Sequence, residues 1–327
     1  MILNGYKLIG EVQNANSGFS KWGFAEKNGK EYFVKELIKP VVPMDRSIMS
    51  DALFEQRRNS CYQFENRLRE MFERINSASH GNLVRVVEFF RLDSKYYIIT
   101  EKVKGTSLPM EKIATISLQK KLLLFKAAAR SFYDLHNSGV VHFDVKPANL
   151  LLKITHGDNF VTRVIDFDSG FMKGEVLDND ELGGDLTYLA PETFLAMCGE
   201  NVTPDEKADI FALGLIFHEY YCGKLPYYDE SEYGYPYEAA LDEGKLKIED
   251  SRMPEAIFKL ISSMLDVNPE KRPSAAEIIN LLNNMTNTDK DSLDINYLEI
   301  NYSCFIKSAM RKRKIVLKKE GIFYEID

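Results

Sequence analysis

Hydrophobic residues in the first hundred positions recur in short segments, rich in aromatic and β-branched side chains, that are typical of β-strands. Such segments cover residues 6–12, 22–26, 31–37, 83–91 and 95–101. Asn28 and Gly29 join the second segment to the third. Both central residues of a type I′ turn need positive φ, which Asn and Gly adopt readily, so these two strands are expected to form a tight hairpin.

One longer segment, residues 51–75, interrupts these strands and has the period of a helix. Its apolar residues are Cys61, Phe64, Leu68, Met71, Phe72 and Ile75. Their spacing places them on one face of a helix, while the rest of the segment is mostly charged. The pattern therefore predicts an amphipathic helix with one apolar stripe.

Beyond Gly105 the pattern changes to longer helical periods, expected at residues 118–137, 208–221, 254–264 and 274–285. A short hairpin is expected between the first two of these helices, with strands at 150–154 and 160–165 around the turn residues 156–159. The sequence predicts the α+β class, with a mainly β part over residues 1–103 and a mainly helical part over residues 104–287. An extension over residues 288–327 reads as a short helical piece followed by a hairpin that turns at 320–321.

The composition narrows the class of protein. The chain has 327 residues, 45% of them apolar, which is enough for a substantial core. A net charge of −7 argues against a broad basic surface, so no nucleic-acid partner is expected. No apolar run is long enough to span a bilayer, and the four cysteines are too scattered for a metal site. A cytoplasmic protein is expected, while the oligomeric state stays open.

Polar residues flank the expected hairpin at 150–165. Asp144, Lys146 and Asn149 precede it, and Asp166 follows it. Because a hairpin returns the chain to its start, these side chains are expected to share one site. Hard oxygen ligands such as Asn149 and Asp166 suit magnesium bound together with substrate phosphates, whereas zinc is normally held by His or Cys. Asp144 is left to hold an attacking hydroxyl.

These residues resemble the motifs of eukaryotic-type protein kinases. Residues 142–149, HFDVKPAN, are similar to the catalytic loop, and residues 165–170, IDFDSG, to the magnesium-binding motif. Further similar segments follow the family's order, namely FVK at 33–35, LAPE at 189–192, DIFALG at 209–214 and NPEKRP at 268–273. The resemblance implies a bilobal kinase fold that transfers the γ-phosphate of ATP, with Mg²⁺, to a protein substrate. The lysine of DVKPAN is typical of serine/threonine kinases rather than tyrosine kinases.

The resemblance also implies roles for single residues in the phosphate transfer. Asp144 and Lys146 would be catalytic, and Asn149 and Asp166 would hold magnesium. In the late motif, Arg272 would pair with Glu192 of LAPE.

Further matching positions would bind the nucleotide. Lys35 would hold the ATP phosphates, oriented by a glutamate of the helix at 51–75. Glu65 is expected to be that glutamate, because it lies with the apolar stripe, and Glu70 is the alternative. The residues beside the adenine would be Thr100, Glu101 and Val103.

The loop expected over the phosphates departs from the family pattern, because residues 15–22, ANSGFSKW, contain one glycine where the family has three. Ser17 and Gly18 are nevertheless expected to approach the phosphates. Trp22 would either cover the adenine or fill the core, and the sequence supports both readings equally.

The activation segment departs from the pattern as well. Phe143 stands where many kinases have an arginine that pairs with a phosphate on this segment. Residues 171–186 contain no Ser, Thr or Tyr and carry instead the acidic residues Glu175, Asp178, Asp180 and Glu181. Activity is therefore expected not to depend on phosphorylation within residues 171–186.

Two aspartates replace other residues near the predicted site. Asp168 stands in place of the glycine of the magnesium motif, and Asp185 in place of a threonine that contacts the substrate. A basic substrate is the hypothesis that Asp185 suggests. Two other functions stay open: a pseudokinase that recruits a partner, and a kinase acting on a small molecule, which the LAPE and NPEKRP segments disfavour.

Overall fold

The computed structural model describes residues 1–13, 20–103, 109–154, 160–177, 182–248 and 253–287, together with two short strands at 318–319 and 322–323. The chain separates into two units, Met1–Leu282 and Asn283–Asp327. All residues with predicted chemistry belong to the first unit.

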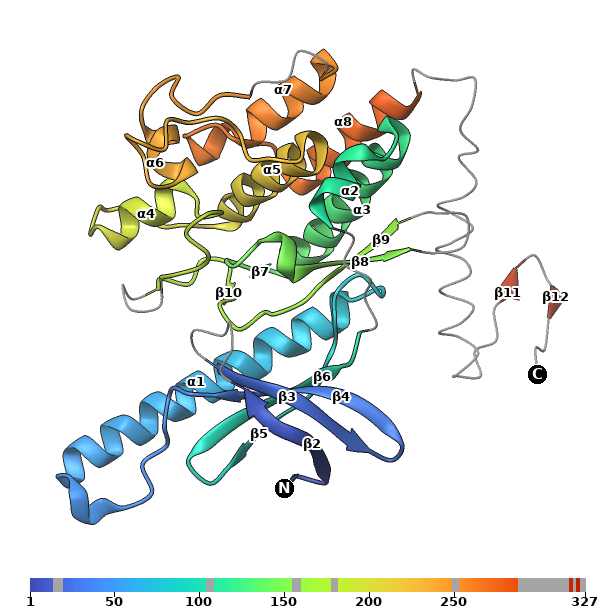
Figure 1. Ribbon diagram of the computed structural model, residues 1–327. Coiled ribbons are helices and arrows are strands. Elements are labelled where there is room, and N and C mark those ends of the chain that lie inside the picture. Colours follow the sequence, from blue (N-terminus) through green and yellow to red (C-terminus); the bar gives the residue numbers. More distant parts are fainter. Residues whose placement is uncertain are drawn as a thin grey trace. The chain divides into compact units, whose positions relative to one another are not determined.

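The first part of this unit is a curled antiparallel sheet (Figure 1). Its strands are β1 (Ile2–Leu3), β2 (Tyr6–Gln13), β3 (Ser20–Lys27), β4 (Lys30–Leu37), β5 (Val86–Leu92) and β6 (Lys95–Glu101). They lie in the order β1-β2-β3-β4-β6-β5. Asn28 and Gly29 have φ of 55° and 73°, which confirms the expected turn between β3 and β4.

Strand β5 starts later than the sequence predicts. Leu83 forms an isolated parallel bridge with Val164, and the Val84 amide donates to the Val164 carbonyl at 2.9 Å. These two residues therefore pair with the helical part of the unit and not with the sheet.

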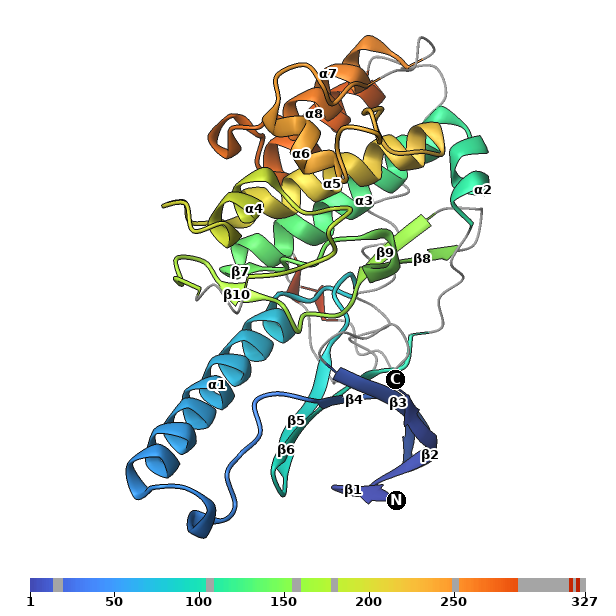
Figure 2. The ribbon, with the colours of Figure 1, turned by 60° about the vertical axis from the view of Figure 1, so that its left-hand side comes forward.

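The helix predicted at 51–75 is α1 (Asp51–Ala78), which follows the 3₁₀ turn η1 (Arg46–Ile48). Its N-cap is Ser50, whose side chain accepts from the Leu53 amide at 3.3 Å. Figure 2 shows α1 beside the curled sheet. The rings of Phe72 and Phe89 meet edge-on with centroids 5.5 Å apart, so the predicted apolar stripe packs against β5.

The rest of the unit is mostly helical. Its helices are α2 (Met110–Thr115), α3 (Leu118–Asn137), α4 (Pro191–Met197), α5 (Glu206–Cys222), α6 (Pro236–Leu241) and α7 (Glu255–Met264), with 3₁₀ turns η2 (Pro147–Asn149) and η3 (Pro269–Lys271). The last helix, α8 (Ala275–Asn287), begins in this unit and ends in the second. α5 is buried along nearly its whole length, and Phe217 on it stacks on Phe125 of α3 with centroids 4.1 Å apart. The four predicted helices and the α+β class are confirmed.

Two short ribbons lie beside α3 and carry the predicted chemistry at their ends. β8 (Leu150–Ile154) pairs with β9 (Phe160–Val164), which confirms the expected hairpin. β7 (Val140–Val141) pairs with β10 (Phe171–Met172), and these two-residue strands were not predicted. The residues between β8 and β9 lie outside the described part of the chain.

In the second unit, β11 (Lys318–Lys319) pairs antiparallel with β12 (Ile322–Phe323), as expected, and the residues of the predicted turn, 320–321, lie outside the described part of the chain. The helical piece expected before it lies outside the described residues. Across the described part of both units, the helices are too short or too polar to cross a membrane.

Candidate active site

The β8–β9 hairpin brings the two ends of the predicted motif together. Leu150 pairs with Val164, and the Ile165 amide donates to the Asn149 carbonyl at 3.0 Å. Asp166 therefore follows directly after the residue that is bonded to Asn149. On the other side, the ammonium group of Lys35 forms an ion pair with Asp166. The structure thus places Asp166, at the end of the hairpin, against Lys35.

Asp144 is the centre of a dense set of polar contacts. Its carboxylate accepts from Lys146 Nζ at 3.0 Å, from Asn149 Nδ2 at 2.9 Å and from the Asp185 amide at 3.0 Å. Asn149 Nδ2 also donates to the Asp144 carbonyl at 2.8 Å. These contacts fix the carboxylate with its side chain 13% exposed, so it keeps some access to solvent.

A side chain of α5 holds the backbone of the loop at residues 142–144. Asp209 accepts from the amides of His142 and Phe143, at 2.9 and 2.8 Å, and its side chain is buried. Phe143 has φ of 66°, a left-handed conformation that is rare for a bulky residue and needs such support. Asp209 therefore anchors the loop that presents Asp144.

His142 links the loop to the segment after β9. Its Nδ1 accepts from the Asp144 amide at 3.2 Å, which makes Nε2 the donor to the Ile165 carbonyl, 2.9 Å away. Asp166 next to it also has φ of 66°. The imidazole thereby couples the positions of Asp144 and Asp166.

Lys35 on β4 is nearly buried and faces two carboxylates, Asp166 and Asp168, with Asp168 Oδ2 2.7 Å from Nζ. Burial lowers the pKa of Lys35, but both carboxylates raise it, and the net pKa lies above the ordinary value of 10.5. Burial raises the pKa of Asp168, Lys35 lowers it, and the negative charges of Asp166 and Asp144 raise it, so that the net pKa of Asp168 is about 6.

The structure does not bring Glu65 to Lys35. Glu65 Oε1 accepts instead from Arg69, one turn further along α1, at 2.7 and 3.1 Å. Glu70, the alternative, pairs in the same way with Arg74 at 2.7 Å. The expected pair is therefore not formed, because each glutamate has an arginine four residues away on its own helix and Lys35 is satisfied by two aspartates.

The sheet face that carries Lys35 also carries an aromatic cluster. Trp22 lies directly opposite Lys35 in the β3–β4 register, and Phe33 lies opposite Thr100 on β6. Trp22 and Phe33 stack with centroids 5.8 Å apart, and Phe24 meets both rings nearly edge-on. Thr100 is half-buried, and so are Glu101 and Val103, which follow it. Ser17 and Gly18 lie outside the described residues.

The donor set limits which metal could be held. The described part of the chain contains no group of three or more His, Cys, Asp or Glu side chains placed to bind a metal ion. Asn149 and Asp166 would offer two oxygen ligands, and Asn149 can offer its amide oxygen because its Nδ2 donates to Asp144. This pair fits a hard cation whose remaining ligands come from phosphates and water.

Comparison with known proteins matches residues 49–282 to the protein kinase domain family. The chain belongs to the protein kinase family. One relative is the serine/threonine-protein kinase cds1 of Schizosaccharomyces pombe, 29% identical over 84% of this chain and 57% of its own length. Another is the serine/threonine-protein kinase PSK2 of Saccharomyces cerevisiae, 30% identical over 62% of this chain and 18% of its own length. The family and the bilobal fold predicted from the sequence are confirmed.

A third relative of this kinase chain is the ovarian-specific serine/threonine-protein kinase Lok of Drosophila melanogaster, 28% identical over 63% of this chain and 43% of its own length. The chain thus spans between 18% and 57% of the length of these three kinases.

Within this kinase domain, the predicted pair of Glu192 and Arg272 is present and buried. Arg272 Nη1 and Nη2 donate to the two carboxylate oxygens of Glu192, each at 2.7 Å. Arg272 Nε also donates to the Asp266 carbonyl at 2.7 Å, and the guanidinium lies 4.9 Å from the ring centroid of Phe211. This bidentate pair joins the end of the activation segment to α5 and η3.

Several contacts of the kinase activation segment were not predicted from the sequence. Glu175 accepts from Arg67 of α1 at 3.2 Å, and Lys173 forms an ion pair with Glu206 of α5. Phe143, in place of an arginine, meets Phe171 edge-on with centroids 4.9 Å apart. The sequence hints at the contact of Glu175 with Arg67, because Glu175 is one of the acidic residues in a segment without hydroxyl groups.

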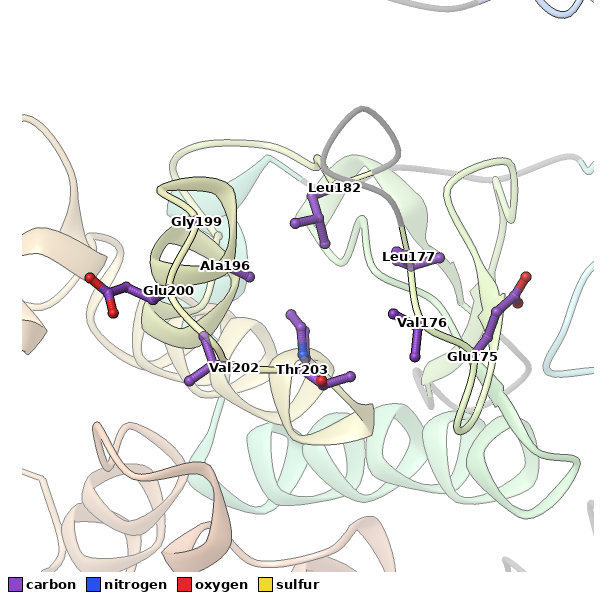
Figure 3. Close-up of a pocket in the computed structure, with 10 residues that line it drawn as sticks. Glu175, Val176, Leu177, Leu182, Ala196, Gly199, Glu200, Val202 and Thr203 are labelled. Carbon is purple, nitrogen blue, oxygen red and sulfur yellow. The ribbon is translucent and has the colours of Figure 1, made fainter.

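A hollow of about 170 Å³ lies between residues 175–177 and Leu182 of the activation segment on one side and the region from α4 to Pro204 on the other. Figure 3 shows apolar side chains such as Leu177, Leu182 and Ala196 around it. The carboxylates of Glu175 and Glu200 point away from it (Figure 3). Among the described residues, none of Lys35, Asp144, Lys146, Asn149 and Asp166 lines this hollow.

Proposed function

We propose that this kinase transfers the γ-phosphate of ATP to serine or threonine hydroxyls of protein substrates. The observation that carries the proposal is the single cluster of Asp144, Lys146, Asn149 and Asp166 opposite Lys35. Phosphoryl transfer requires little covalent chemistry from the protein and relies on alignment and charge neutralisation. Two ammonium groups and several oxygen ligands in one site suit that task.

Asp144 would hold the substrate hydroxyl and accept its proton. Its carboxylate is kept in place by an amide, a side-chain amide and an ammonium group, so it does not need to reorganise when the substrate arrives. Lys146 lies 3.0 Å from Asp144, where its charge would steady the γ-phosphate as it moves to the hydroxyl.

Asn149 and Asp166 would hold magnesium. When bound, the ion would neutralise phosphate oxygens of the nucleotide. Lys35 would contribute a second positive charge, directed at the α- and β-phosphates from the sheet side. The bound ATP would thus lie between the sheet and the β8–β9 hairpin.

The adenine would lie against the sheet face that carries Trp22 and Phe33. Both aromatic residues share this face with Lys35, which supports a nucleotide role for Trp22 over a purely structural one. Aromatic rings stack on nucleic-acid bases with a gain of about 1–3 kcal/mol per base. Thr100, Glu101 and Val103 would line the edge of the base.

Serine and threonine are the proposed acceptors because Lys146 occupies the position typical of serine/threonine kinases. The names of the three relatives agree with this choice. Selection of basic substrates by Asp185 stays a prediction, and Asp185 Oδ2 lies 3.7 Å from Lys146 Nζ, which offsets part of its charge. A cytoplasmic location is likewise proposed from the sequence.

The test compares the wild type with Asp144→Asn, using labelled ATP, magnesium and a mixture of protein acceptors, followed by mass spectrometry of the modified residues. We expect phosphoserine or phosphothreonine with the wild type, and a rate about 10²- to 10⁴-fold lower with the variant. An equal rate in both proteins would contradict the role of Asp144.

A second measurement separates a kinase from a pseudokinase. Trp22 is the one tryptophan of the chain, so its fluorescence reports on the nucleotide face. We expect MgATP to change this fluorescence with saturation. Binding without any transfer to protein would favour the pseudokinase, and transfer to small alcohols alone would favour a small-molecule kinase.

A further inference from the structure

Lys35 needs a permanent counter-charge, because its side chain is only 11% exposed. A buried ammonium group is costly unless it is paired and hydrogen-bonded. In protein kinases this partner is a glutamate of the helix beside the sheet. The structure shows where the counter-charge of Lys35 comes from in this chain.

The carboxylates of α1 are all accounted for elsewhere. Asp51 and Glu55 lie 4.0 and 2.5 Å from Arg46, Glu65 is bonded to Arg69, and Glu70 to Arg74. Glu73 is exposed. The helix therefore supplies no carboxylate to Lys35 within the described residues.

The buried face of α1 is apolar where it meets the segment after β9. Met71 is fully buried, and its Sδ lies 3.2 Å from the point where a Cβ on Gly170 would stand. Leu68, Phe72 and Ile75 complete the same buried stripe. A thioether and hydrocarbon groups cannot balance an ammonium charge, so the counter-charge has to come from another element.

Asp168 supplies it from the loop itself. Its Oδ2 accepts from Lys35 Nζ at 2.7 Å, and its side chain is 23% exposed. Asp166 also contacts Lys35, but under the proposed function Asp166 binds magnesium when the nucleotide is present. Asp168 is then the carboxylate that stays with Lys35, and the sequence has an aspartate here where the family motif has glycine, which has no side chain to pair.

We propose that Asp168 is the positioning residue of Lys35 and replaces the glutamate expected on α1. This inference rests on the proposed function, because it concerns how Lys35 is held for the nucleotide phosphates. Asp168 acts through Lys35 and does not itself touch the transferred phosphate. In this chain the carboxylate that orients Lys35 would thus lie on the loop of Asp166, the proposed magnesium ligand, and not on α1.

The test is a double-mutant cycle with Asp168→Asn, Lys35→Ala and the variant that carries both changes. Asparagine keeps the shape of aspartate and removes its charge. We expect Asp168→Asn to lower kcat/KM for ATP at least about tenfold, which is a larger loss than Glu65→Gln causes. The loss is expected in kcat and in the KM for ATP, with the KM for the protein substrate changed by less than about twofold.

The combined variant shows whether Asp168 acts through Lys35. We expect its kcat/KM to lie within about twofold of that of Lys35→Ala, since a carboxylate that only orients Lys35 has no effect once Lys35 is gone. Urea unfolding of the wild type and the three variants shows whether a lower kcat/KM comes only from a smaller fraction of folded protein.

Two results would overturn the assignment: Asp168→Asn as active as the wild type, or losses that multiply in the combined variant. With an active wild type, either result refutes the role of Asp168 and leaves the proposed function standing. A wild type that neither binds MgATP nor transfers phosphate refutes the proposed function, and the role of Asp168 with it.

Discussion

Arg67 on α1 donates a hydrogen bond of 3.2 Å to Glu175 of the activation segment, with both side chains about three-quarters buried at 24% and 25% exposure. In many kinases an activation segment is held by a phosphate that pairs with arginine. In this chain Glu175, which is negatively charged without modification, makes a comparable contact with Arg67. The ion pair ties the position of α1 to the segment that leads toward the substrate.

The first prediction concerns this pair. Glu175→Gln removes the charge and should lower kcat about three- to tenfold, which corresponds to about 0.6–1.4 kcal/mol in the barrier. Steady-state kinetics with a protein substrate measure the change. Glu73→Gln is the matched control, because Glu73 is an exposed carboxylate on α1. A Glu175→Gln protein with wild-type kcat would show that the pair has no part in activity.

The second prediction follows from the lack of hydroxyl groups at residues 171–186. Treatment of the purified protein with a phosphatase should leave its activity within about twofold, since Glu175 carries its charge permanently. Mass spectrometry before and after treatment checks that phosphates were removed. A large loss that returns on rephosphorylation would refute this independence.

The third prediction uses two adjacent glycines. Gly184 has φ of 124°, and a Cβ on it would stand 2.8 Å from the Phe143 carbonyl oxygen. Gly184→Ala should therefore displace the Asp185 amide that donates to Asp144, and lower kcat/KM about 10- to 100-fold. Gly183→Ala should change little, because its Cβ would have no neighbour within 4 Å among the described residues. Equal kinetics for the two variants would contradict the argument.

The fourth prediction concerns stability. Arg272→Ala leaves the buried carboxylate of Glu192 without its partner and should lower the free energy of unfolding by about 3–5 kcal/mol. Arg272→Lys should recover only a small part of the loss, because an ammonium group cannot form two parallel bonds to the carboxylate. Urea unfolding measures both variants. Full recovery with lysine would show that charge alone matters here.

The fifth prediction is a pH dependence at the pair of Lys173 and Glu206. Burial raises the pKa of Glu206, but the hydrogen bond and charge of Lys173 lower it, and the net pKa lies below its ordinary value of 4.5. A carboxyl whose pKa is lowered on folding stabilises the protein above its ordinary pKa, and this stabilisation is lost as the pH falls through the folded-state pKa.

The wild type should therefore be more stable than Glu206→Gln near neutral pH, and the difference should shrink as the pH falls below 4.5. The difference should be at most about 1 kcal/mol, because Lys173 is 55% exposed and solvent screens the pair. Urea unfolding across this pH range is the measurement. A difference that does not change with pH would exclude the carboxylate charge as its source.

Elements with a strong local signal were predictable from the sequence. The helix at Leu118–Asn137 has a serine cap and a long apolar face, and its bounds were predicted without error. Asn28 and Gly29 likewise determined a turn by their backbone preference alone. By contrast, α4 and α6 have too few turns for a clear period, and β7 and β10 too few residues for alternation.

The site was predictable as far as chain connectivity determines it. The Ile165 amide, one residue before Asp166, bonds to the Asn149 carbonyl because a hairpin lies between them. The partner of Lys35 was not predictable in this way, since the helical period places Glu65 near the apolar stripe but does not show that Arg69 competes for it. Which of several carboxylates reaches a given lysine depends on tertiary packing.

The contact between Met71 of α1 and Gly170 has a consequence for control of the enzyme. Kinases that pair their lysine with the helix can be switched off by swinging the helix outward, which breaks one ion pair. In this chain such a swing would break the ion pair of Arg67 with Glu175 and slide apolar surfaces past each other, but it would leave Lys35 paired with Asp168. Effectors that bind α1 would then change the kinase activity only by degrees. An effector that switches the activity fully on or off would have to act on the loop at 166–170.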